Sequence, residues 1–354
     1  MSTTEIPDST SAGPSPRPTR DATVPDTMSA VVGERYGAPE ELRVDTIAVP
    51  APGPDQVVLR VAGASTNALD WHLVTAQPFF VRAMLGIRRP KQPTPGNDVS
   101  GTVVAVGSNV TSRQIGEEVF GNCWRGACAE YAVASANQLE LVPTGVDVAE
   151  SSTVGVAAFT ALQAVRDHGE IGAGDRVVII GASSGVGVFA IQLAVAAGAE
   201  VTAVTSTANL DLARSLGAHH VVDRTTTDPV AAVVGGQVAP YDVVLDLAGA
   251  LPPRKILPAL TERGRFVLVG GRKTGHLWPL VTMPALAIRS RLSKRTLRVF
   301  TASETPEDRV VLAAKLADGS LRPVIGERIG LDGVARAIRS HGDRTAVAKI
   351  LVQP

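Results

Sequence analysis

The chain has 354 residues, of which 45% are hydrophobic and 19% are charged. This is enough apolar material for one or two folded domains, and it excludes a largely disordered chain. The 34 Lys and Arg residues balance 34 Asp and Glu residues, so no overall positive field favours nucleic acid or an anionic membrane as a partner. Cys123 and Cys128 are the two cysteines. Two are too few for a disulfide framework, so we expect unreactive thiols and a reduced, cytoplasmic setting.

Residues 1–27 are predicted to form a disordered tail. They hold ten Ser or Thr residues and five Pro residues, with Ile6 and Val24 as their branched aliphatic side chains. No secretory signal is expected, because the tail lacks an apolar core segment. Residues 177–199 carry no charge over nearly the length of a membrane span. Their middle, residues 181–187, is a glycine-bearing turn that would break a spanning helix, so membrane contact is not expected.

Residues 28–150 are predicted to form a β-rich domain. Short β-like runs separated by Gly and Pro occur at residues 30–33, 57–62, 99–106, 118–120 and 129–133. Similar runs return at residues 323–325 and 349–352, around one helix at residues 331–339. The segment 320–354 is therefore expected to complete the first domain.

Residues 151–319 are predicted to form an α/β domain with a doubly wound parallel sheet. Buried strands alternate with amphipathic helices about every 20 to 25 residues, which is typical of such sheets. The strand-like runs are residues 177–180, 200–205, 220–223, 242–246 and 266–270. Helices are expected at residues 186–197 and 209–216, with Gly198 and Gly217 at their C-terminal ends.

A phosphate-binding turn is predicted where the strand at residues 177–180 passes directly into the following helix. The turn and helix start consist mainly of small residues: Ser183, Ser184, Gly185, Val186 and Gly187. Unpaired backbone N–H groups and the positive end of the helix dipole favour a pyrophosphate at this place. With further βα units behind it, the turn predicts dinucleotide binding rather than a merely structural turn.

The end of the second strand of this domain favours NADP(H) over NAD(H). NAD-binding domains place an acid there to hold the ribose 2′-hydroxyl, whereas this strand ends in Thr205, Ser206 and Thr207. Their hydroxyl groups can donate to a 2′-phosphate, and Arg224, after the third strand, can pair with its charge. The alternatives are helix capping for Ser206 and Thr207, and a solvated surface charge for Arg224.

Two oxidoreductase families share a glycine turn of this kind. Short-chain dehydrogenases place it near the N-terminus and use a Tyr followed by a Lys four residues later, whereas here it begins at Gly181 and no Tyr has a Lys at that spacing. From Met28 onward the chain instead resembles the zinc-independent medium-chain dehydrogenases/reductases, in the quinone oxidoreductase and zeta-crystallin branch. The resemblance rests on the motifs MSAVVGERYGAPEELRV, VAGASTNALDWH, PGNDVSGTVVAVG, AAFTALQAV, GDRVVIIGASSGVGVFAIQLA, YDVVLDLAG and GRFVLVGG.

The resemblance implies a GroES-like β-rich catalytic domain beside a Rossmann domain. It implies that Asn67, Asp70 and His72 form the catalytic face. It also implies that cofactor contacts come from Thr160, Gly249, Gly270 and Gly271. The alternatives are helix capping for Asn67, stabilisation of a helix N-terminus for Asp70, and a structural or surface role for His72. Trp71 is expected to pack in the core.

The resemblance also implies that no metal takes part in the reaction. The zinc alcohol dehydrogenases of this superfamily bind their catalytic metal through a Gly-His-Glu segment and two cysteines. This chain has Gly96, Asn97 and Asp98 in that segment, and Asn67 where a cysteine would precede the active-site helix. Tetrahedral zinc needs three or four N, S or O ligands, so we expect no zinc site here. We expect Asp98 to be a buried hydrogen-bonding residue instead.

We therefore expect an NADPH-dependent reductase that transfers hydride to a small-molecule acceptor, a quinone or an α,β-unsaturated carbonyl. Without a Lewis acid, an electron-poor acceptor is easier to reduce than a simple alcohol is to oxidise. A zinc-free alcohol dehydrogenase or carbonyl reductase, and a non-catalytic NADPH-binding redox sensor, are the alternatives. Five basic residues lie within residues 289–298 without an assigned role. The resemblance implies a homodimer formed through residues 296–300.

Overall fold

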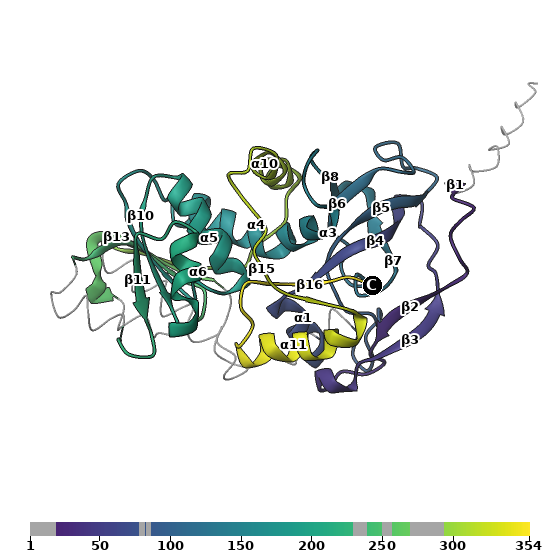
Figure 1. The fold of residues 1–354 in the computed structure, drawn as a ribbon, viewed down its shortest axis with the longest axis horizontal. Helices are drawn as coiled ribbons and strands as arrows, with labels where there is room; N and C mark the ends of the chain where they lie inside the picture. The colour runs from purple at the N-terminus through teal and green to yellow at the C-terminus, as the bar shows by residue number, and fades with distance from the viewer. Residues whose placement is uncertain (1–18, 78–81, 83–85, 229–238, 250–256, 270–293) are drawn as a thin grey trace, which may run out of the picture.

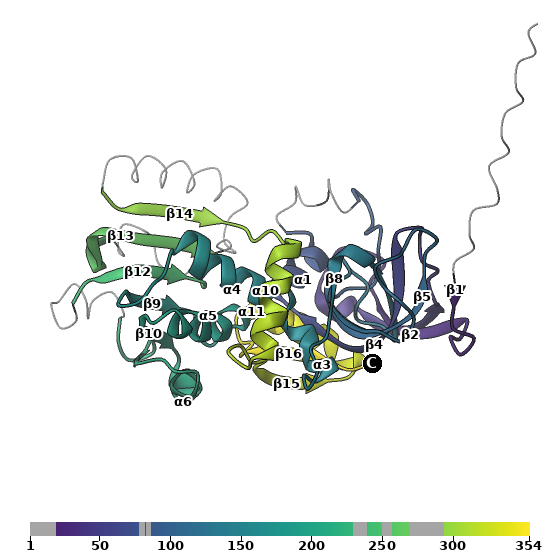
Figure 2. The ribbon, with the colours of Figure 1, turned by 90° about the horizontal axis from the view of Figure 1, so that it is seen from above.

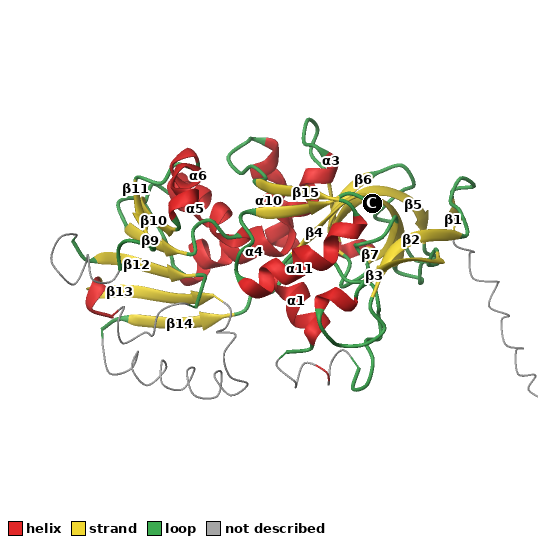
Figure 3. Cartoon of the chain, turned by 60° about the horizontal axis from the view of Figure 1, so that its bottom comes forward, coloured by secondary structure: helices red, strands yellow, loops and turns green. Residues whose placement is uncertain are grey.

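The computed structural model describes residues 19–77, 82, 86–228, 239–249, 257–269 and 294–354. Two β-sheets lie one beside the other along the long axis of the molecule (Figure 1). Several helices lie between the two sheets (Figure 3). The chain builds most of the first sheet, then the second, and returns to the first at its C-terminal end. The region between the sheets therefore receives residues from distant parts of the sequence.

The first sheet has eight strands among the described residues. Its path runs β15-β16-β4-β5-β6-β8, with β1 paired to β5 and β7 paired to β4. The strands are β1 (Thr19–Arg20), β4 (Gln56–Thr66), β5 (Asp98–Val106), β6 (Glu118–Asn122), β7 (Tyr131–Ser135), β8 (Leu139–Leu141), β15 (Ile325–Ile329) and β16 (Lys349–Val352). A separate antiparallel pair is β2 (Thr27–Val32) and β3 (Arg43–Ala48). The C-terminal strands β15 and β16 join this sheet, while the domain boundaries 28–150, 151–319 and 320–354 stay predictions.

The predicted disordered tail is wrong for its last nine residues, 19–27. Strand β1 pairs antiparallel with β5, and the Asp21 amide donates to the Val104 carbonyl at 2.8 Å. Val24 packs against a small hydrophobic cluster that includes residues of β2 and β5. The partner strand lies far along the chain, so local composition could not reveal this pairing. Residues 1–18 lie outside the described residues.

The second sheet consists of parallel strands in the order β11-β10-β9-β12-β13-β14. They are β9 (Arg176–Ile180), β10 (Glu200–Thr205), β11 (His220–Asp223), β12 (Tyr241–Asp246), β13 (Leu260–Val269) and β14 (Thr296–Phe300). In chain order this is 3-2-1-4-5-6, the order of doubly wound dinucleotide-binding sheets, whose ligands bind where the order reverses. That point lies between β9 and β12. The predicted fold class, a β-rich domain plus a doubly wound parallel sheet, is confirmed by this topology.

Strand β9 is apolar from Val177 to Ile180 because both of its faces are buried there. Val177 and Ile179 belong to the core that includes the following helix, whereas Val178 and Ile180 belong to a second core on the opposite face. Successive side chains of a strand point to opposite faces of the sheet. Each buried Val or Ile side chain contributes about 1.5–3 kcal/mol to folding.

The helices connect and cover the sheets. They are α1 (Ala68–Thr75), α3 (Val148–Ser151), α4 (Gly155–Gln163), α5 (Gly185–Ala196), α6 (Leu210–Ser215), α10 (Pro306–Ala317) and α11 (Val334–Asp343). The helical stretch Val148–His168 is long and apolar enough to cross a membrane, but 78% of its apolar window is buried inside the protein. It is therefore a core helix. The charge-free residues 177–199 form β9, a turn and α5, as the glycines predicted.

The described part of the basic segment makes hydrogen bonds and ion pairs with other parts of the chain. Lys294 pairs with Glu262 at 2.5 Å, and Arg295 donates to the carbonyl oxygens of residues 260 and 261 at 3.0 and 3.1 Å. Arg298 pairs with Glu170 at 2.7 Å. These bonds join the start of β14 to the start of β13 and to Glu170. Residues 289–293 lie outside the described residues.

Candidate active site

The turn between β9 and α5 requires small residues because its backbone folds tightly. Gly181 has a φ of +84°, a left-handed conformation that favours glycine. A Cβ on Gly187 would lie 2.4 Å from the Gly181 carbonyl oxygen. Ser184 caps α5, since its Oγ accepts a hydrogen bond from the Gly187 amide at 3.1 Å. The first amides of α5 stay available for an anion, as at other helix starts.

Hydrogen bonds tie this turn to the end of β10. Thr205 Oγ1 donates to Ser183 Oγ at 2.7 Å, and Asn209 Nδ2 donates to the same oxygen at 3.3 Å. Ser206 makes no side-chain cap for the helical turn that follows it. Its Oγ instead accepts from Asn209 Nδ2 at 3.0 Å. The turn after β9 and the end of β10 therefore lie side by side.

An acid that the sequence did not predict lies close to the end of β10. Thr207 Oγ1 donates to Asp223 Oδ2 at 2.5 Å. Hydrogen bonds from Thr207 and Thr225 lower the pKa of Asp223, so its carboxyl is ionised at neutral pH. The Arg224 amide donates to the Thr205 carbonyl at 2.8 Å. The exposed Arg224 side chain makes no hydrogen bond or ion pair with the residues that the structure describes, so it is available to a phosphate.

The remaining predicted cofactor residues divide into three cases. Thr160 lies buried on α4 and donates its hydroxyl proton to the Val156 carbonyl at 2.6 Å, which leaves its oxygen as an acceptor. Gly249 follows β12 with a φ of +57°, beside the reversal point of the strand order. Gly270 and Gly271 lie outside the described residues.

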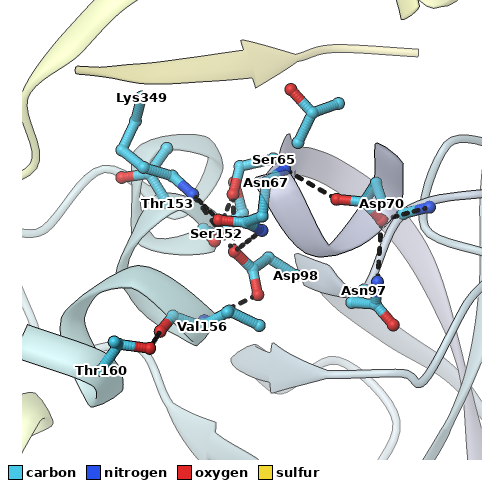
Figure 4. Close-up of polar contacts among 12 residues, drawn as sticks. Ser65, Asn67, Asp70, Asn97, Asp98, Ser152, Thr153, Val156, Thr160 and Lys349 are labelled. Atoms are coloured by element: carbon cyan, nitrogen blue, oxygen red, sulfur yellow. Dashed lines mark hydrogen bonds and ion pairs between the residues drawn. The ribbon is translucent and has the colours of Figure 1, made fainter. Parts of the chain in front are cut away.

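A buried polar network joins the first sheet to α4 (Figure 4). Asp98, the first residue of β5, is fully buried at its centre. Asp98 Oδ2 accepts from Ser65 Oγ and from Asn67 Nδ2, each at 2.8 Å. Asp98 Oδ1 accepts from the Val156 amide at 2.8 Å, at the start of α4. Lys349 Nζ donates to Asn67 Oδ1 at 2.5 Å and lies 3.4 Å from Asp98 Oδ2.

Lys349 is the cation of this network, and it was not predicted from the sequence. It is 1% exposed, so desolvation lowers the pKa of its ammonium group, while the charge of Asp98 acts in the opposite direction. Its side chain also borders the phosphate turn, since a Cβ on Gly185 would lie 3.1 Å from Lys349 Cδ. The preceding amide, of Ala348, donates to the Ser183 carbonyl at 2.7 Å. Lys349 thus contacts both the phosphate turn and Asn67.

Asp70 stabilises the start of α1. Its Oδ2 accepts from the Asn67 amide at 2.7 Å, and its Oδ1 accepts from the Gly96 amide at 3.2 Å and from Asn97 Nδ2 at 2.8 Å. Burial raises the pKa of Asp70 to about 6, and the charge of Asp98 acts in the same direction. The helix N-terminal role is therefore present, and through it Asp70 positions Asn67.

Asn67 lies at the start of α1 but directs its side chain into the network, and its catalytic role stays a prediction. Its backbone occupies the N-cap position of α1, but its side chain makes no capping bond. The side-chain amide binds Asp98 and Lys349 instead. Because an amide nitrogen carries two N–H groups, one of them has no partner among the described residues.

His72 lies outside the network. Its Nδ1 is 2.7 Å from the Gln77 carbonyl, beyond the C-terminal end of α1, and its ring meets the Trp71 ring edge-on at 5.0 Å. The geometry supports the structural alternative for His72 rather than the predicted catalytic role. Trp71 packs against the core of the first sheet, as expected. A histidine that was not predicted, His341, lies with Nε2 at 3.0 Å from the hydroxyl of Thr66, the residue before Asn67.

The donor set at Asp98 does not fit a zinc ion. No group of three His, Cys, Asp or Glu side chains that could hold a metal lies together in the part of the chain that the structure describes. Asp98 already accepts three hydrogen bonds and faces the Lys349 ammonium. Cys123 and Cys128 are buried free thiols. Burial raises the pKa of both, in line with the expected unreactive thiols.

Comparisons with known proteins identify the family of the chain. A family model described as alcohol dehydrogenase GroES-like domain matches residues 53–162, and one described as zinc-binding dehydrogenase matches residues 185–310. The human protein named quinone oxidoreductase is 31% identical over 334 residues, which cover 92% of this chain and 98% of that protein. Trans-enoyl reductase pgmF of Aspergillus terreus (strain NIH 2624) is 32% identical over 330 residues, covering 85% and 87%. The solved quinone oxidoreductase from Coxiella burnetii aligns with a TM-score of 0.81 at 24% identity, over 93% of this chain and 99% of that chain.

Proposed function

This chain belongs to the medium-chain dehydrogenase/reductase family, in its quinone oxidoreductase branch, and from that membership we propose that it uses NADPH to reduce a quinone or an α,β-unsaturated carbonyl compound. The family makes the protein an oxidoreductase with a nicotinamide cofactor. NADPH, the acceptor class, independence from zinc and a cytoplasmic location are the proposed parts.

The network of Asp98, Lys349 and Asn67 is the observation that carries the proposal. A buried ammonium group faces the carboxylate, and an ammonium group cannot coordinate an alcohol or acidify it as a Lewis acid does. The network instead holds the Asn67 amide, whose free N–H can donate to a carbonyl oxygen of the acceptor. A single hydrogen-bond donor suits an acceptor that is already electron-poor.

The proposed mechanism depends on positioning. Bound NADPH supplies the hydride. The start of α5 and Arg224 hold the phosphate groups of the cofactor, and Asn67 orients the acceptor oxygen. The acceptor takes its proton from water, since the described acids of the network, Asp70 and Asp98, are buried and engaged in hydrogen bonds. Fixing the two reactants in this geometry lowers the entropic part of the barrier.

NADPH is proposed over NADH because the Arg224 guanidinium, directly after β11, has no hydrogen-bond partner among the described residues. The Asp223 carboxylate beside Thr207 opposes this preference. Two like charges 4 Å apart repel by about 4 kcal/mol at an effective dielectric constant of 20. If Arg224 pairs with the 2′-phosphate of NADPH, this attraction offsets the repulsion. NADH lacks the 2′-phosphate and so gains nothing from Arg224.

The proposal is tested by measuring oxidation of NADPH and of NADH with quinones, enones and aldehydes, together with the zinc content of the same sample. We expect oxidation of NADPH that depends on a quinone or an enone, without stoichiometric zinc. Reduction of NADP that strictly depends on an alcohol would favour the alcohol dehydrogenase alternative. Tight cofactor binding without turnover of any acceptor would favour the redox sensor. A requirement for stoichiometric zinc would contradict the proposed mechanism.

The role of Asn67 is tested in the same assay. Asn67→Ala should lower kcat by about 100-fold, the usual cost of losing a hydrogen-bond donor at a developing oxyanion. The Kd of NADPH should stay close to that of the wild type. Asn109→Ala, which removes a surface amide that donates to Asp55, is the matched control. An equal loss of NADPH binding in Asn67→Ala would assign Asn67 to the fold alone.

A further inference from the structure

The loop between β6 and β7 brings a buried arginine to the candidate site. Asn122, the last residue of β6, lies opposite Asp98 in the antiparallel pair of β5 and β6. The loop that follows is fastened to the segment just before Asp98, because the amides of Cys123 and Ala127 donate to the carbonyl oxygens of that segment at 2.9 and 3.2 Å. Arg125 lies between these two attachments, next to the network.

The guanidinium group of Arg125 is buried without hydrogen-bond partners. Arg125 is 6% exposed, and its Nε and Nη1 atoms have no partner among the described residues. Burying a charged group in this way is costly unless it is paired. Asp70 supplies an opposite charge in the neighbourhood, but its oxygens accept from three other donors. The N–H groups of Arg125 are therefore left for a ligand.

The backbone of this loop holds the arginine in a strained conformation. Trp124 has a φ of +50° and Arg125 a φ of +88°, in the region that favours glycine. Trp124 is 54% exposed, whereas Arg125 is turned inward. A glycine at position 125 would remove both the strain and the buried charge. Strain of this kind is typically retained at functional sites.

A second unsatisfied group lies in the same neighbourhood. Asn97 is fully buried, and its Oδ1 has no hydrogen-bond partner among the described residues. Its Nδ2 donates to Asp70, and the amide oxygen points away from that carboxylate (Figure 4). The hydroxyl of Tyr36, which interacts electrostatically with Arg125, is used on the Gly86 carbonyl at 2.8 Å. The unpaired N–H groups of Arg125 and the unpaired Oδ1 of Asn97, both close to Asp70, indicate a polar ligand.

We propose that Arg125 binds an anionic oxygen of the acceptor, so that the preferred substrates are α,β-unsaturated carbonyl compounds that carry a carboxylate. The inference rests on the proposed function and narrows it to acidic acceptors. Asn67 donates to the carbonyl oxygen while the carboxylate pairs with Arg125. The hydride of NADPH forms a C–H bond at the β-carbon, the electrons of the C=C double bond move to the α-carbon, and that carbon takes a proton from water. The products are the saturated ketoacid and NADP⁺.

The test uses two substrates with the same enone, 3-benzoylacrylate and its methyl ester, of which only the first carries a negative charge. In the wild type, kcat/KM should be higher for the acid than for the ester. Arg125→Gly should lower kcat/KM for the acid by about 10- to 100-fold, the usual effect of a lost hydrogen bond to a charged group, mainly through KM. The ester should change little, and Arg125→Lys should recover part of the preference for the acid.

Arg344→Gly is the matched control, because Arg344 is an exposed arginine that also has a positive φ, +60°. It should leave the ratio of acid to ester unchanged. A parallel fall for acid and ester in Arg125→Gly would mean that Arg125 supports Asp70 or the fold, and would overturn the inference. An Arg125→Gly variant whose kcat/KM is unchanged for both the acid and the ester would overturn it as well.

A binding measurement separates this inference from the proposed function. If no acceptor is reduced, the proposed function fails, but calorimetry can still measure the affinity of the NADP-loaded protein for 3-benzoylpropionate, the saturated acid. Weaker binding to Arg125→Gly than to the wild type would support the carboxylate site on its own. Equal affinities would overturn it.

Discussion

Lys349 is held at two points, since its methylene chain lies against the phosphate turn and its ammonium group binds Asn67 and Asp98. Lys349→Met keeps most of the chain but leaves the Asp98 carboxylate buried without a cation, so the free energy of unfolding should fall by about 3–5 kcal/mol. Denaturant unfolding measures this loss. The turnover number kcat should fall as well, because Asn67 loses the donor to its Oδ1.

A double variant separates positioning by Lys349 from stability. Asp98→Asn removes the unpaired charge, so Lys349→Met combined with Asp98→Asn should recover much of the lost stability without recovering kcat. Recovery of both would mean that Lys349 acts through the fold alone. Lys349→Arg, which keeps the charge, should retain more activity than Lys349→Met.

Asp70 makes the stability of the protein depend on pH. Its pKa is about 6 in the folded protein, above its ordinary value, so the folded state binds this proton more tightly than the unfolded state does. The contribution of Asp70 to stability is complete below pH 4 and is lost as the pH rises through 6. The free energy of unfolding of the wild type, relative to that of Asp70→Asn, should fall by about 2 kcal/mol between pH 4 and pH 7. Urea titrations of both proteins across this range measure the difference, and no change in it would contradict the role of burial.

Sequence patterns identified some site residues and missed others for a physical reason. Asn67 and Asp98 stand in motifs that the family resemblance could place. Lys349 sits in a short apolar run near the C-terminal end of the chain, and its partners lie in residues 67 and 98. Such a long-range pairing leaves no local signal, and neither does the burial of Arg125. The suggested catalytic role of His72 rested on its chemistry, whereas the structure directs its ring to the end of its own helix.

At the scale of single elements, the first turn of α5 tolerates no side chain at Gly187. Gly187→Ala would place a methyl group 2.4 Å from a carbonyl oxygen of the turn, so the helix start must move away from β9. We expect weaker NADPH binding by about tenfold or more together with a lower Tm, because the backbone could no longer approach the pyrophosphate closely. Calorimetry and thermal unfolding measure the two effects.

Gly172→Ala is the control for this prediction. A Cβ at Gly172 meets no atom within 4 Å, so this variant should bind NADPH as the wild type does. Retention of full NADPH affinity by Gly187→Ala would show that the phosphate groups bind elsewhere.

Elements with a strong local pattern were predicted closely. Strands β10, β11 and β16 have the expected bounds, and α5 begins one residue earlier than expected. In each of these strands, apolar runs end at polar or glycine-bearing turns. Helix α10 was not predicted, although Thr305 caps it and Pro306 begins it. Strand β1 was missed because its two residues gain their conformation from pairing with β5.

At the scale of the whole molecule, the N-terminal segment should contribute to stability without affecting the site. Deleting residues 1–27 removes β1 and the packing of Val24, so the free energy of unfolding should fall by roughly 1–3 kcal/mol. Deleting residues 1–18 keeps both contacts and should leave stability unchanged. Because β1 lies at the far end of the first sheet from the second sheet (Figure 1), kcat of the folded protein should be the same in both. Equal stability of the two truncated proteins would contradict a role for residues 19–27.

The proposed homodimer uses the outer edge of the second sheet. Strand β14 lies at that edge beyond β13 (Figure 2) and pairs with β13 alone in the described sheet. An open strand edge offers unpaired backbone groups to a second copy. Light scattering should give the mass of a dimer, and Val299→Lys should shift it toward the monomer while NADPH binding persists. A wild-type monomer at all concentrations tested would contradict this interface.

The position of Lys349 also has a consequence for how the protein is made. Ribosomes synthesise the chain from its N-terminus, so Asn67 and the phosphate turn emerge long before the lysine that connects them. Until residue 349 has left the ribosome, Asp98 has no counter-charge and the Asn67 amide oxygen has no donor. A nascent chain can therefore fold much of both sheets, but catalytic competence arises only after Lys349 has emerged.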